Sequence, residues 1–70
     1  MTEYAVVIED AGGNYSAYVP DLLGCVSTGA SVNEVTVNIK EAIALHIELL
    51  REHGEPVPPS TSRAGTVRVG

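Results

Sequence analysis

The sequence has 70 residues, 44% of them apolar, and carries nine acidic side chains against four basic ones. This length allows one small domain, and the apolar fraction is too high for a disordered acidic tail. A chain of this size buries only about 60% of the surface that its unfolded form exposes. We therefore expect one folded domain over residues 1–70 that associates with further copies of itself or with a partner.

The cysteine count and the lengths of the apolar segments indicate where in the cell the protein is located. Cys25 is the only cysteine, which excludes an intrachain disulfide and a zinc site built from cysteines. Small secreted domains usually need several disulfides, and the first residues lack the basic stretch and apolar run of a signal peptide. No segment approaches the roughly 20 apolar residues that a membrane span requires. We expect a cytoplasmic protein that has no membrane partner.

The charges are unevenly placed along the chain. Residues 1–55 contain nine acidic and two basic side chains, a net charge of −7, whereas residues 56–70 contain two arginines and no acid. A negative field repels the phosphate backbone of nucleic acids and attracts basic proteins. These charges predict a basic protein partner and no direct binding of nucleic acid.

Three short strands are predicted before residue 30. Residues 3–9 and 15–20 are rich in β-branched and aromatic side chains, and Gly12 and Gly13 favour a turn between them. Pro20 closes the second strand, and a short corner leads into a third strand at residues 25–28.

A long helix is predicted over residues 32–53. Ser31 and Glu34 form the capping-box pattern, in which the serine hydroxyl accepts from the Glu34 amide and the glutamate reaches back. Gly54 favours the left-handed conformation that ends a helix, and Pro56 prevents its continuation. The apolar side chains between these ends recur at helical spacing and form one broad stripe: Val32, Val35, Ile39, Ala42, Ile43, Leu49 and Leu50.

The last residues predict a connector and a fourth strand. Residues 56–62 are rich in proline and serine and read as a stiff connector, and residues 66–69 alternate between polar and apolar side chains. The element order is therefore β-β-β-α-β. This order predicts an α+β fold in which a small antiparallel sheet carries one long helix on one face.

One helix covers only one face of a sheet, so the other face is expected to be an interface. Pairing Val7 with Ala17, and Ala5 with Val19, would place these small side chains under the helix. The opposite face would then hold Tyr4, Val6, Ile8 and Tyr18. An exposed apolar patch of this kind usually marks an interface. We expect a homo-oligomer, either a dimer or a tetramer.

The sequence contains few candidates for chemistry. His46 and His53 are seven residues apart, whereas metal-binding histidines on a helix favour a spacing of three or four. No histidine or lysine lies near Cys25 in the sequence to lower the pKa of its thiol, so a small buried apolar role is expected. Glu9, Asp10 and Asp21 are candidates for the magnesium-binding carboxylates of a nuclease, but they flank a turn and a corner, where acidic residues serve solubility and turn geometry. We expect no catalytic residue, no cofactor and no metal site, and keep the nuclease as an alternative.

Two segments resemble a known family. Residues 13–29 read GNYSAYVPDLLGCVSTG and resemble the G-Y-x-A-x-V-P-D-L-P-G-C-x-x-x-G signature of HicB-like antitoxins. Residues 31–43 read SVNEVTVNIKEAI and are similar to the family's T-x-E-E-A-x-x-N-I-x-E-A-I, and the segment GEPVPP at 54–59 extends the match. This sequence departs from the pattern at Leu23 (usually proline), Ser31 (threonine) and Val35 (alanine).

The resemblance implies a fold and a function. The family has a partial ribonuclease H-like β-β-β-α-β fold, and its members bind a small basic mRNA-cleaving toxin of the HicA type and cover its active site. Many relatives carry a further DNA-binding domain; the printed sequence stops after the predicted last strand, so we expect a short form without one. The expected contact region is the corner Asp21-Leu22-Leu23, with Tyr18 and the outer strand side chains. The alternative is an orphan homo-oligomeric binding domain of the same fold without a cognate toxin.

Overall fold

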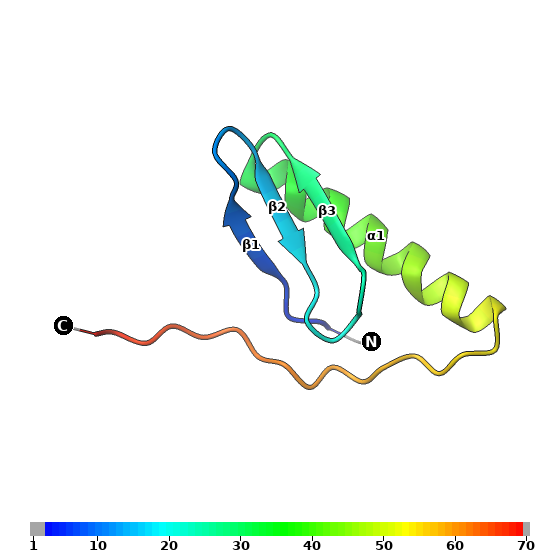
Figure 1. Cartoon of the computed structure of the whole chain (residues 1–70). Helices are drawn as coiled ribbons and strands as arrows, with labels where there is room; N and C mark the ends of the chain where they lie inside the picture. Colours follow the sequence, from blue (N-terminus) through cyan, green and yellow to red (C-terminus); the bar gives the residue numbers. More distant parts are fainter. Residues whose placement is uncertain (1–2, 70) are drawn as a thin grey trace.

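The computed structural model describes residues 3–69 as a three-stranded antiparallel sheet with one helix across one face (Figure 1). The strands are β1 (Val7–Asp10), β2 (Tyr15–Tyr18) and β3 (Val26–Gly29), in the spatial order β1-β2-β3, and the helix is α1 (Val32–Glu52). This arrangement confirms the predicted sheet and helix. Within residues 3–69 no helix is long and apolar enough to cross a membrane.

The pairing of β1 differs from the predicted register by one residue. Val7 lies opposite Tyr18, and Ile8 lies opposite Ala17. Because side chains alternate between the faces of a strand, this shift exchanges the two faces of β1 relative to β2. The prediction that Tyr4, Val6 and Ile8 share the open face with Tyr18 is therefore wrong, since β1 now points Ile8 toward the helix side together with Ala17.

Helix α1 begins with a variant of the predicted capping box, in which the glutamate reaches back to the residue before the N-cap Ser31. The Ser31 hydroxyl accepts a hydrogen bond from the Glu34 amide at 3.0 Å, and the Glu34 carboxylate accepts from the Ala30 amide at 3.0 Å. These two contacts satisfy amides that have no carbonyl partner within the helix. The second turn ties the helix to the sheet, since the Asn38 side-chain amide donates to the Thr28 carbonyl of β3 at 2.8 Å.

The helix ends at the glycine that the sequence indicates. Gly54 has a φ of +70°, its amide donates to the Arg51 carbonyl at 3.1 Å, and the Glu55 amide donates to the Leu50 carbonyl at 2.8 Å. This pair of bonds is the Schellman motif, which closes a helix through a left-handed residue. At 1.5 Å per residue the helix is about 31 Å long, and it extends beyond the short sheet (Figure 1).

The core lies between the first half of α1 and the sheet. It consists of six buried side chains: Ala17, Val19, Leu22, Cys25, Val35 and Ile39. Helix and sheet are in close contact at Gly29, where a Cβ atom would stand 2.5 Å from the Val35 backbone nitrogen. The partly buried side chains Tyr4, Val6, Tyr15, Ala42 and Ile43 surround this core.

The chain after the helix crosses the molecule without entering the sheet (Figure 1). Residues 66–69 are extended but pair with no strand of the described chain, so the predicted fourth strand is absent. The hydrogen bonds that hold the chain after the helix lie before residue 63. The Tyr4 hydroxyl donates to the Pro58 carbonyl at 2.6 Å, and both Asp21 carboxylate oxygens accept from the amides and hydroxyls of Thr61 and Ser62, each at 2.9 Å.

We predict that Gly29→Ala destabilises the domain by about 1–3 kcal/mol, the usual cost of forcing extra atoms into a packed core. The added Cβ meets the backbone of Val35, which a side-chain rotation cannot relieve. Gly65→Ala is the matched control because a Cβ there has no atom within 4 Å. Urea denaturation followed by circular dichroism measures both variants, and equal midpoints would show that the helix does not need this close approach.

The contacts of Asp21 predict a pH dependence. The hydrogen bonds, with that of the Ser62 amide the largest, lower the pKa of Asp21 from 3.8 to about 2. Because the folded pKa lies below the unfolded one, these contacts stabilise fully above about pH 4 and are lost as the pH falls through about 2. The amide resonances of Thr61 and Ser62 should titrate with a midpoint near 2 in NMR spectra. A midpoint near 4 would contradict these contacts. So would Thr61 and Ser62 amide resonances that are the same in the wild type and in Asp21→Asn at neutral pH.

Candidate protein-binding surface

The structure separates the residues predicted to form the contact region. Tyr4 and Val6 pack against the core, and Ile8 lies on the helix side of the sheet with 38% of its surface exposed. Leu22 is only 1% exposed because it fills the core beneath the β2–β3 corner, so its prediction as a contact residue is wrong. Asp21 is partly buried and its carboxylate holds residues 61 and 62.

Tyr18 and Leu23 remain at the surface and lie at one end of the open sheet face. Leu23 projects from the corner with 94% of its surface exposed. The register places Tyr18 between Val7 and Val26 in one cross-strand row on this face. Tyr18, Leu23 and Val26 line one depression of about 310 Å³.

A second depression continues this surface onto the helix. It has a volume of about 150 Å³ and lies between the start of β3 and the second half of α1, and it shares Gly24, Cys25 and Val26 with the first depression. Its helix side is formed by Ala42, Leu45, His46 and Leu49. We call the exposed apolar side chains around the two depressions the apolar corner: Tyr18, Leu23, Val26, Leu45 and Leu49.

Val26, Leu45 and Leu49 were not predicted as contact residues. The sequence does contain a signal for the two leucines, since they are four residues apart and therefore adjacent on a helix. The exposure of these two leucines depends on how far α1 extends past β3, which the spacing alone does not show. Leu45 consequently keeps 56% of its surface exposed.

Acidic side chains flank the helical part of the apolar corner. Glu41 and Glu48 lie four residues before and three residues after Leu45, and Glu52 lies three residues after Leu49; all three are exposed. Residues at these spacings are neighbours on a helix surface. The apolar corner thus has a negatively charged border, which favours a partner with an apolar patch surrounded by basic side chains.

The groups considered for chemistry do not converge. Cys25 is buried, and desolvation raises the pKa of its thiol, which disfavours the nucleophilic thiolate. His46 lies beside leucines in the second depression. Across residues 3–69 no three histidine, cysteine or carboxylate side chains come close enough to hold a metal ion, so Glu9, Asp10 and Asp21 form no shared site.

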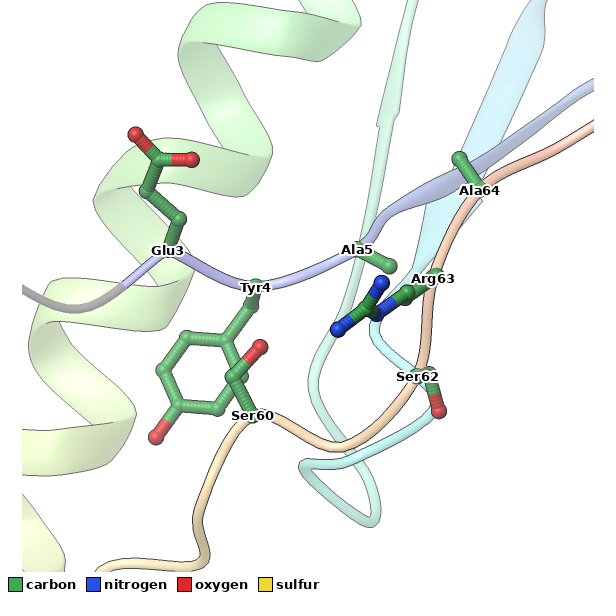
Figure 2. A pocket seen from close by; sticks show the side chains of 7 residues that line it. All are labelled: Glu3, Tyr4, Ala5, Ser60, Ser62, Arg63 and Ala64. Atoms are coloured by element: carbon green, nitrogen blue, oxygen red, sulfur yellow. The ribbon is translucent and has the colours of Figure 1, made fainter.

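A third depression lies between the N-terminal segment and the chain after the helix (Figure 2). It has a volume of about 340 Å³ and separates residues 3–5 from residues 60–64, with the Arg63 side chain directed toward Ala5. The hydroxyls of Tyr4 and Ser62 already bind Pro58 and Asp21. This depression is a gap between two chain segments and offers little apolar surface to a partner.

A comparison of this sequence with models of protein families identifies its family. Residues 4–68 match the model described as the HicB_like antitoxin of bacterial toxin-antitoxin systems. The match covers nearly the whole chain, including both segments whose motifs resemble the family.

Individual relatives agree with this match. A UPF0150 protein of Thermoplasma acidophilum is 41% identical over 93% of this chain and 96% of its own length, and one of Synechocystis is 45% identical over 79% and 71%. A 14.9 kDa protein of Haemophilus phage HP1 is 42% identical over 81% of this chain, which spans 43% of the phage protein.

A solved structure shares the fold. A chain of the HicA3 and HicB3 toxin-antitoxin complex superposes with a TM-score of 0.74 and 33% sequence identity, over 84% of this chain and 70% of that chain. Its fold agrees with three antiparallel strands followed by one long helix. The chain therefore belongs to the HicB-like antitoxin family of bacterial toxin–antitoxin systems.

Proposed function

We propose that this chain is an antitoxin that binds a small basic mRNA-cleaving toxin of the HicA type and blocks its active site. It acts as a binding protein and not as an enzyme, and it meets the toxin in the cytoplasm, where mRNA is cleaved. The family match and the neighbouring HicA3 and HicB3 complex support the type of partner. The apolar corner with its acidic border is the observation that supports the contact surface.

The chemistry of the partner fits such a surface. A protein that cleaves mRNA must hold a polyanionic backbone, so its RNA-binding face is expected to be basic. The exposed Glu41, Glu48 and Glu52 would attract that face and compete with RNA for it. Opposite charges mainly accelerate the encounter, whereas a few well-packed apolar side chains supply most of the affinity. In this proposal those side chains are Leu23 and Leu45, with Tyr18 beside them.

A second candidate function is an orphan homo-oligomeric domain of the same fold. Val7, Tyr18 and Val26 form an apolar row on the open sheet face, and a second copy is one way to cover it. The two functions are distinguished by the partner that is recovered. A neighbouring gene for a small basic protein supports the antitoxin, and purification of this chain alone with copies of itself supports the orphan domain.

Co-expression of this chain with the small basic protein encoded beside it should relieve the growth arrest that the basic protein causes. We predict that Leu23→Asp combined with Leu45→Asp weakens the complex about 30–1,000-fold, because interface residues of this kind each contribute on the order of 1–2 kcal/mol. Isothermal titration calorimetry measures the affinity, and restored growth arrest reports the loss in cells. Both positions are exposed, so the variant should keep its helical circular dichroism spectrum.

Val37→Asp is the matched control for this variant. Val37 is 56% exposed, as Leu45 is, and it lies on the same helix but lines neither depression of the apolar corner. The control should bind the toxin with unchanged affinity. The proposed surface is wrong if Val37→Asp weakens binding as much as the double variant, and the antitoxin function is wrong if the wild type neither binds the basic protein nor restores growth.

A further inference from the structure

Residues 63–69 end in a segment that alternates like a β-strand but pairs with no strand of the described chain. The chain is extended there, and Val67 and Val69 are each 87% exposed. Thr66 and Arg68 alternate with these valines, so in a strand both valines would point to one face and Arg68 to the other. An extended, alternating segment with free backbone groups is suited to add to the edge of a sheet.

The sheet offers one open edge for such an addition. On the β3 side, the Thr28 carbonyl already accepts from Asn38, and the first turn of α1 lies against Gly29. On the other side, β1 has no neighbour in the order β1-β2-β3 as far as the described residues extend. β1 is four residues long, which matches the alternating segment 66–69.

Charge also favours the β1 edge. Glu9 and Asp10 are exposed on β1 and Glu3 precedes it, whereas the tail carries Arg63 and Arg68. If Arg68 lies opposite Glu9, the valines fall on the helix side, because Glu9 and Ile8 point to opposite faces. They would then cover Ile8, which is 38% exposed on that face. This alignment joins opposite charges on one face and apolar side chains on the other.

The tail does not make this contact with its own β1. Asp21 holds Thr61 and Ser62, and beyond them the depression of about 340 Å³ separates residues 60–64 from residues 3–5 (Figure 2). Arg63 points into this gap, and the tail then runs past the sheet (Figure 1). We propose that residues 66–69 of each chain add as a fourth strand to β1 of a second copy, so that two chains exchange tails in a closed dimer. A reciprocal exchange satisfies both open edges and leaves the apolar corner free, and it does not depend on the proposed antitoxin function.

Sedimentation equilibrium of the full chain tests the exchange. The wild type should have the mass of two chains, against 7.3 kDa for one. Thr66→Pro combined with Val67→Pro removes two adjacent backbone donors, one of which must face β1, and should raise the dissociation constant of the dimer at least about tenfold, a loss of roughly 1.4 kcal/mol. Val67→Thr keeps a β-branched side chain and the backbone donor, and should remain a dimer. A monomeric wild type, or a dimer unaffected by the double proline variant, would overturn the proposal.

Three further variants identify the contact itself. Arg68→Glu should weaken the dimer, and adding Glu9→Arg should restore it, because the charge pair is then reversed. In a Cys25→Ala background, a chain with Glu9→Cys and Arg68→Cys should form a disulfide-linked product of two chains on mild oxidation. A disulfide within one chain would show that the tail pairs with its own β1, and no disulfide at all would show that the two positions do not meet; either result overturns the exchange.

Discussion

Helix α1 approaches strand β3 so closely at Gly29 that even a methyl group there would collide with the Val35 backbone. Beside this contact, Val35 and Ile39 are buried in one cluster with Ala17. The capping box at Ser31 and the bond from Asn38 to Thr28 act at the same end of the helix. The domain is therefore held together at the start of α1, and its second half is free to extend beyond the sheet.

The proposed binding surface follows from that arrangement. Since the helix is about 31 Å long and the strands have four residues each, the second half of the helix is only partly covered, and Leu45 and Leu49 line a depression beside Val26 at the start of β3. The β2–β3 corner fills the space beside them and adds Leu23 and Val26. A sheet with one helix thus exposes apolar side chains at one end, and acidic residues on the same helix give that end its charge.

Most of the fold could be predicted from the sequence because its signals are local. The cap at Ser31, the glycine end at Gly54 and the three strands each depend on neighbouring residues. The register of β1 is different, because a shift of one residue leaves the strand pattern unchanged yet exchanges its faces. That single shift moved Tyr4 and Val6 into the surroundings of the core. The prediction of Leu22 as a contact residue was wrong for a related reason, because its burial depends on how the β2–β3 corner folds against the sheet.

The central claim is that the apolar corner, and not the β1 edge, receives the toxin. Hydrogen exchange measured by mass spectrometry, with and without a purified toxin of the HicA type, tests it most directly. The account predicts slower exchange in the complex over residues 18–26 and 42–52, with little change over 7–10. Protection confined to β1 and the tail, or identical exchange in the free and mixed samples, would contradict it.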